Sequence, residues 1–185
     1  MFKTVASAAL LPLAGGLTRP AAAQTYVGDA YSVMAADERF TTWVRLIDAG
    51  GLQSYARAAT PYTVLAVTET GWSKFPNIVQ DLLGYQSQSG SHNSQDAFPD
   101  TSKIVKLVRS HVVRGKHYSG EVMGKKLTVT TVAGTPLVID GSKQPVTVMW
   151  NSVDTGQSIT ATVPDVPLVA INAVIYPIDD VGPTA

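Results

Sequence analysis

The sequence has 185 residues, of which 45% are hydrophobic and 15% are charged, and its formal net charge at pH 7 is zero. This composition excludes a highly charged disordered chain, and the lack of a basic excess argues against nucleic acid as a partner. Since the chain contains no cysteine, disulfides, thiolate nucleophiles and thiolate zinc sites are excluded as well.

Residues 1–23 have the pattern of a signal peptide. Lys3 supplies a positive charge, residues 5–17 are apolar with many small side chains, and three alanines at 21–23 satisfy the small-residue rule for cleavage. The apolar stretch is shorter than the roughly 20 residues needed to span a bilayer, and no later stretch is long and apolar enough. We therefore expect cleavage near Ala23, which leaves one exported domain over residues 24–185, a monomer or weak oligomer in the periplasm or the medium.

The first predicted element of the domain is a helix that begins after Asp37, a residue that can cap the first free N–H groups. Its apolar side chains recur at the spacing of one helix face and are Phe40, Trp43, Val44 and Ile47. Two glycines at 50–51 end the helix, and residues 52–58 are predicted to form a second short helix before Pro61.

A buried strand is predicted at 62–67, where aromatic and β-branched residues follow one another. The apolar side chains between Trp72 and Leu83 then predict one helix capped by Thr68 or Thr70. Pro76 falls in its early turns, where a missing N–H costs least.

Residues 86–99 are polar and nearly uncharged, and they predict a surface loop that is either flexible or used in binding. The helix predicted after it has four side chains on one face, which are Ile104, Leu107, Val108 and His111. His111 should therefore point into the core and donate a ring hydrogen to a backbone carbonyl. Gly115 offers the turn that separates it from His117.

The rest of the chain predicts short strands at spacings of roughly 8 to 12 residues, with turn chemistry between them. The runs are 127–132, 137–139, 146–150 and 159–163. A last apolar run, 166–181, contains Pro177, which suits an edge or a bulge better than a central strand. Helices followed by strands indicate an α+β fold.

The order of these motifs resembles the fasciclin-type (FAS1) domain over about residues 27–182. Four segments carry the resemblance, and they are the leading helix ending near 50–52, the strand 62–68, the His-Val-Val-x-Gly motif in 107–115 and the closing segment 170–181. The resemblance implies a wedge-like β-sandwich of short, mainly antiparallel strands with helices packed at the N-terminal half. It also implies that the domain serves in adhesion or matrix and surface interactions without catalysis, with His111 and Asn172 as structural residues of the motifs.

The partner of such a module would be a protein or a polysaccharide of the cell surface, matrix or envelope. The side chains that we expect to touch it are Arg114, Lys116, His117, Tyr118 and Trp150. Trp150 is included because it ends a strand just before Asn151, where an exposed ring could stack on a sugar.

Two other functions stay open. Ser110 or Ser119 could act with His111 in a hydrolase, although the sequence has no Gly-x-Ser-x-Gly elbow. An apolar cavity could instead carry a small apolar ligand. No cofactor or metal is predicted, because no nucleotide-binding motif occurs and His111 and His117 lie six residues apart without an obvious third ligand.

Overall fold

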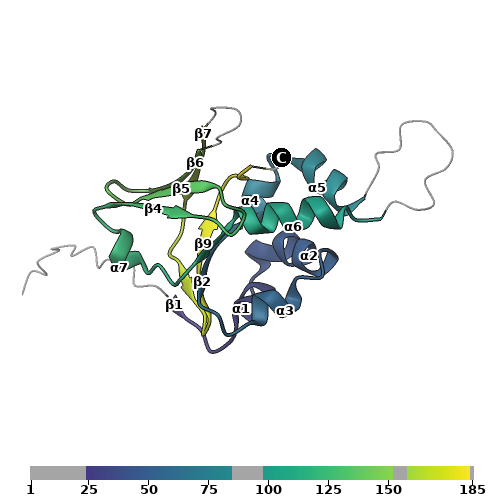
Figure 1. Ribbon diagram of the computed structural model, residues 1–185, viewed down its shortest axis with the longest axis horizontal. Coiled ribbons are helices and arrows are strands. Elements are labelled where there is room, and N and C mark those ends of the chain that lie inside the picture. The colour runs from purple at the N-terminus through teal and green to yellow at the C-terminus, as the bar shows by residue number, and fades with distance from the viewer. Residues whose placement is uncertain (1–23, 85–97, 152–157, 184–185) are drawn as a thin grey trace, which may run out of the picture.

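The computed structural model describes residues 24–84, 98–151 and 158–183. The strands of a first sheet are β1 (Gln24–Thr25), β2 (Tyr62–Val67), β3 (Val112–Arg114), β8 (Leu168–Val169) and β9 (Ala173–Ile178). Those of a second sheet are β4 (Lys126–Thr130), β5 (Pro136–Asp140), β6 (Val146–Asn151) and β7 (Ser158–Val163). The strand orders are β1-β8-β9-β2-β3 and β4-β5-β6-β7, so the predicted α+β class is confirmed (Figure 1).

The helices come mainly from the first half of the described chain. They are α1 (Ala30–Ala35), the 3-10 helix Glu38–Phe40, α2 (Thr41–Ala49), α3 (Gln53–Arg57), α4 (Glu69–Trp72), α5 (Pro76–Leu83), α6 (Thr101–Ser110) and α7 (Ser119–Val122). Asp37 accepts a hydrogen bond from the N–H of Arg39, which confirms its predicted role as a cap. Among the described residues, no helix is long and apolar enough to cross a membrane.

β2 and β9 lie at the centre of the molecule and pair in parallel from Tyr62 with Ala173 to Val67 with Ile178. Every residue of both strands is buried. Figure 1 shows the reason, since helices α1 to α6 lie on one side of these two strands and the second sheet lies on the other. A strand covered on both faces needs apolar side chains at every position, which is the pattern of both sequences.

The single helix predicted between Trp72 and Leu83 is wrong, because the structure divides it into α4 and α5. The break falls at Phe75, whose φ of −132° and ψ of 54° lie outside the helical region. Pro76 causes it, since proline disfavours the helical conformation of the residue before it and suits the first position of a new helix.

Pro177 was expected at an edge or a bulge, but it lies in β9, which is flanked by β8 and β2. β9 is thus a central strand and not an edge strand, but within the described part of the chain the position of Pro177 is unpaired on one side. β8 pairs with β9 only through Val174 and Ile175, so β9 has no paired strand beside Pro177 on that side among the described residues. The missing N–H of the proline therefore interrupts no ladder bond there.

The second sheet is a meander in which each strand pairs antiparallel with the next. Alternation along its strands turns one set of side chains inward, and those that are buried are Leu137, Ile139, Val148, Trp150, Ala161 and Val163. Trp150 is 0% exposed, so the expectation of an accessible ring at a strand end is wrong. Its partner across the sheet is Leu137, another inward residue, because side chains opposite one another share a face.

The topology gathers one set of loops at one end of the first sheet. β2 and β9 begin there, and because β3 and β8 run antiparallel to them, those strands end there, as does β1. The loops at this end, called the loop end below, are residues 26–29, 58–61, 115–118 and 170–172. Segments far apart in the sequence therefore share one surface.

Two predictions fall outside the described residues. The signal peptide at 1–23 is one, and the polar loop at 86–99 is the other, of which the structure describes Phe98 and Pro99 alone.

Candidate functional site

His111 follows the last turn of α6 and is completely buried, which confirms the orientation predicted from the helix spacing. The N–H of Gly182 donates to Nε2 at 3.0 Å. The ring hydrogen is therefore on Nδ1, which lies 2.9 Å from the carbonyl oxygen of Leu107. Burial lowers the pKa of His111 to about 4, against the smaller raising effect of the Leu107 carbonyl, so the ring is neutral at pH 7.

Two tryptophans enclose this ring. The ring centroids of Trp43 and Trp150 lie 5.3 and 5.2 Å from that of His111, both in tilted orientations. The indole N–H of Trp150 donates to the carbonyl oxygen of Ser110 at 2.9 Å. Trp150 thus joins the second sheet to α6, and this position, not a sugar surface, explains its burial.

The hydrolase alternative gains no support from this geometry. The Oγ atom of Ser110 lies 3.0 Å from Nδ1 of His111, but it also lies 2.7 Å from the carbonyl oxygen of Leu107, to which it donates. Because Nδ1 carries the ring hydrogen, it cannot accept a proton from Ser110. Nε2 already accepts a hydrogen bond from the N–H of Gly182, so the buried ring has no free nitrogen that could act as a base for Ser119.

Asn172 is buried at the loop end and joins the loop 170–172 to the first residue of α1, to α3 and to the loop 58–61. Its side-chain oxygen accepts from the N–H of Ala30 at 2.8 Å, and its amide donates to the carbonyl oxygens of Ala56 and Ala58 at 3.1 and 2.7 Å. Both polar atoms of this side chain are therefore hydrogen-bonded to backbone, which is the arrangement that a buried amide requires.

The segment after β3 is held against the sheet by its backbone. Thr63 of β2 accepts from the N–H of His117 at 2.9 Å and donates to the carbonyl oxygen of Gly115 at 2.8 Å. The hydroxyl of Tyr176 donates to the carbonyl oxygen of His117, also at 2.9 Å. The ammonium of Lys116 reaches the loop 170–172, where it donates to the carbonyl oxygens of residues 170 and 171 at 2.9 and 3.0 Å.

Four of the five predicted contact residues lie together here. The side chain of Arg114 is exposed and makes no hydrogen bond or ion pair with another described residue. Tyr118 is 42% exposed, and the Lys116 ammonium lies 5.6 Å from its ring centroid. His117 is half-buried, with Nε2 3.2 Å from the carbonyl oxygen of Arg114 and Nδ1 3.5 Å from the carboxylate of Glu121. The fifth residue, Trp150, lies in the core.

Sequence reasoning missed the apolar part of this surface. Ile171 is 69% exposed and Val27 is fully exposed, and their loops meet where the N–H of Ile171 donates to the carbonyl oxygen of Gly28. Val27 precedes the first predicted element, and Ile171 lies within the last apolar run, 166–181. The pairing of β1 with β8 brings their two loops to the same end of the sheet.

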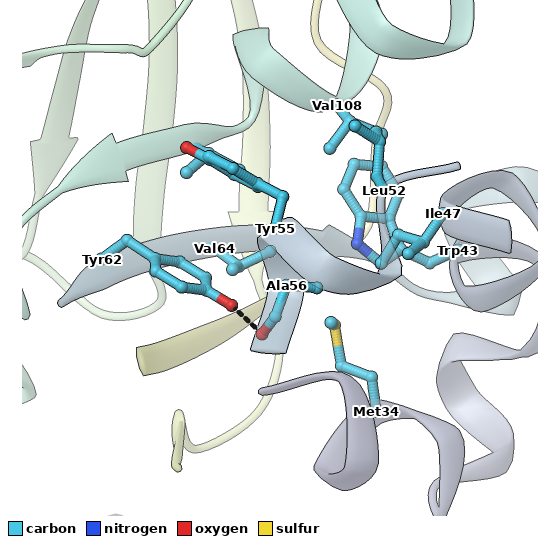
Figure 2. Close-up of a pocket in the computed structure, with 10 residues that line it drawn as sticks. Met34, Trp43, Ile47, Leu52, Tyr55, Ala56, Tyr62, Val64 and Val108 are labelled. Carbon is cyan, nitrogen blue, oxygen red and sulfur yellow. Dashed lines mark hydrogen bonds between the residues drawn. The ribbon is translucent and has the colours of Figure 1, made fainter. Parts of the chain in front are cut away.

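An apolar cavity lies between α1, α2, α3 and β2, and Figure 2 shows the side chains around it. Its volume is about 10 Å³, close to the least that holds one water molecule. Tyr62 lines one side, and its hydroxyl donates to the carbonyl oxygen of Ala56, as the dashed line in Figure 2 marks. A space of this size gives no support to the carriage of an apolar ligand. Within residues 24–84, 98–151 and 158–183, no three His, Asp or Glu side chains are grouped so that they could hold a metal.

Comparison with known proteins points to one family. The model of the fasciclin domain matches residues 38–181. The uncharacterized protein sll1735 of Synechocystis sp. is 25% identical over 154 residues, which cover 80% of this chain and 92% of that protein. A solved FAS1 domain pair from the insect cell adhesion molecule fasciclin I is similar over 82% of this chain, with 14% identity and a TM-score of 0.43. The match covers 43% of that structure, so the chain spans less than half of its length.

Proposed function

Because the chain belongs to the fasciclin domain family, whose members are adhesion and interaction modules and generally not enzymes, we propose that it is a non-catalytic binding module. It acts outside the cytoplasm and binds a protein or polysaccharide of the cell surface, matrix or envelope. The observation that carries the proposal is the loop end, where exposed Arg114 and Tyr118 flank a backbone fixed by hydrogen bonds to β2 and β9.

The composition of this surface supports a contact role. Arginine and tyrosine are enriched among the residues that dominate binding energies, and an exposed apolar neighbour such as Ile171 adds area that a partner can remove from water. A segment already held in one conformation loses little entropy on binding. The contact residues that we propose are therefore Arg114, Lys116, His117, Tyr118 and Ile171.

The proposed location rests on residues 1–23, which have the charged, apolar and small-residue regions of a signal peptide. Fasciclin domains are typically extracellular or secreted, which agrees with it. Mass spectrometry of the protein recovered from the producing cells tests this point. Cleavage near Ala23 predicts a mature chain that starts at about Gln24. If all recovered molecules still carried residues 1–23, export by this route would be contradicted.

Binding is tested by titrating the purified protein onto washed envelope material from the producing organism. We expect the double variant Arg114→Ala/Tyr118→Ala to bind at least about tenfold more weakly, since each lost contact of this kind costs about 1 kcal/mol or more. The matched control is Lys143→Ala/Thr160→Ala, which removes two exposed side chains of the second sheet and its turns. Equal binding by both double variants would remove the loop end from the proposal.

A further inference from the structure

A surface groove of about 790 Å³ lies on a different part of the molecule from the loop end. It runs between the outer face of α6 and the turn that joins β4 to β5, with Pro183 beside it. Figure 1 shows this turn next to the C-terminal end of α6, where the N–H of Ala133 donates to the carbonyl oxygen of Arg109 at 3.1 Å. The residues that line the groove are Thr101, Ser102, Val105, Lys106, Arg109, Ser110, Val132, Ala133, Thr135 and Pro183.

The helix periodicity explains why α6 presents this face. Its buried residues Ile104, Leu107 and Val108 pack inward, so Val105, with Lys106 and Arg109, falls on the opposite side. Both cationic side chains are exposed, and neither side chain makes a hydrogen bond or ion pair with another described residue. Among the described residues that line the groove, none is acidic. The groove is therefore positively charged along one wall.

A third cationic residue of α6, Lys103, differs from these two because its side chain is paired with carboxylates. The ammonium of Lys103 lies 3.0 Å from the carboxylate of Asp81 and 3.6 Å from that of Asp100, so its charge is already compensated. Among the described residues, no carboxylate compensates the charges of Lys106 and Arg109, and these charges favour an anionic occupant.

The walls indicate which kind of anion fits. Val105, Val132, Ala133 and Pro183 make part of the surface apolar, and its lining has no aromatic side chain within residues 24–84, 98–151 and 158–183. Sugars are commonly held by stacking on aromatic rings, whereas small aliphatic walls suit the side chains of a peptide. The lining therefore favours a peptide over an acidic polysaccharide.

The spacing of the charges fits an extended chain. Lys106 and Arg109 are three apart on α6, so their Cβ atoms are about 5–6 Å apart. Alternate side chains of an extended peptide lie on one side at a spacing of about 6.6–6.8 Å. Two carboxylates separated by one residue can thus face both cations at once. We infer that this groove binds an extended acidic peptide segment of a partner protein, with Asp or Glu at alternate positions.

The experiment uses a fluorescein-labelled peptide in which Glu and Val alternate over eight residues, and a matched peptide with Gln in place of Glu. Fluorescence anisotropy is measured with the purified full chain at two salt concentrations. We expect saturable binding of the Glu peptide that weakens with salt, and binding at least about tenfold weaker for the Gln peptide. The variant Lys106→Ala/Arg109→Ala should bind the Glu peptide at least about tenfold more weakly than the unchanged protein does.

The control variant is Lys143→Ala, an exposed cation in the turn after β5, at the other end of that strand from the groove. It should bind the Glu peptide within about twofold of the unchanged protein. Equal affinity for the Glu and Gln peptides, or unchanged affinity in the double variant, would overturn the inference. A uronic acid oligosaccharide that displaces the peptide and binds more tightly would assign the groove to a glycan instead. The loop end contributes none of these residues, so failure here leaves the proposed function untouched.

Discussion

His111 and His117 lie six residues apart, and the structure gives them opposite surroundings. His111 has both ring nitrogens bonded inside the core between two tryptophans, whereas His117 lies at the loop end beside Glu121 and the exposed Tyr118. The glycine between them has a φ of 86°, a conformation that turns the chain out of β3 and that other residues rarely adopt. A histidine in a recognisable motif can therefore be structural while its neighbour supplies the surface.

The comparison predicts its largest effect for His111→Ala. The substitution removes the acceptor of the Gly182 N–H and the donor to Leu107, and it leaves a space between Trp43 and Trp150. We expect the free energy of unfolding to fall by about 3 kcal/mol, measured by urea denaturation. A loss below about 0.5 kcal/mol would show that His111 is not the structural member of the pair.

The close approach of the chain to the His111 ring predicts the next effect. A Cβ atom added to Gly182 would lie 2.8 Å from Trp150 and 3.0 Å from two ring atoms of His111, and both of these rings are completely buried. We expect Gly182→Ala to lower the free energy of unfolding by about 2 kcal/mol. Gly120→Ala is the control, because a Cβ atom there would meet no atom within 4 Å.

The depressed pKa of His111 predicts a pH dependence of stability. The folded value of about 4 lies below the ordinary 6.5, so between these values the unfolded chain binds more protons than the folded one. The free energy of unfolding that the neutral His111 contributes is complete above pH 6.5 and is lost as the pH falls, by about 1.6 kcal/mol between pH 6.5 and 5. Urea denaturation at both pH values measures it.

The variant His111→Gln removes the titrating group and should remove most of this pH dependence. Carboxylates change little between pH 6.5 and 5, so they contribute little to the difference. A slope that persists unchanged in His111→Gln would assign the effect to other groups.

The smallest effect is expected at His117. Its side chain lies 3.5 Å from the carboxylate of Glu121, which is 56% exposed, and surface pairs of this kind contribute little. His117→Ala should change the free energy of unfolding by less than about 0.5 kcal/mol by the same denaturation. A loss as large as that of His111→Ala would abolish the distinction between the two residues.

Sequence patterns predicted correctly those elements whose burial follows from a regular spacing or an unbroken run of apolar residues. The helix spacing predicted correctly that His111 is buried, and the run of apolar residues predicted correctly that β2 is buried. Trp150 was misplaced because a strand end looks exposed in the sequence, while the partner that covers it, α6, lies 40 positions earlier at Ser110. The apolar half of the loop end was missed for the same reason, since Val27 and Ile171 are neighbours only after the first sheet has formed.

The groove on α6 was also beyond the reach of the sequence. The free charges of Lys106 and Arg109 look no different from that of Lys103 in the chain, and only the positions of Asp81 and Asp100 separate them. Which charges are compensated is decided by contacts between elements, and these cannot be read from spacing alone.

The parallel pairing of β2 with β9 has a consequence for how the chain folds. Each strand of the second sheet pairs with the next strand along the chain, so that sheet needs only hairpin contacts. β2 can pair with β9 only after a long loop has closed. The hydroxyl of Thr68, just after β2, donates to the carbonyl oxygen of Ile178, which lies 110 positions later in the sequence. Loops of this length close slowly, and we expect the second sheet to form first and the central pair of the first sheet to set the folding rate. The central strand β2 therefore lacks its parallel partner until β9 has been synthesised.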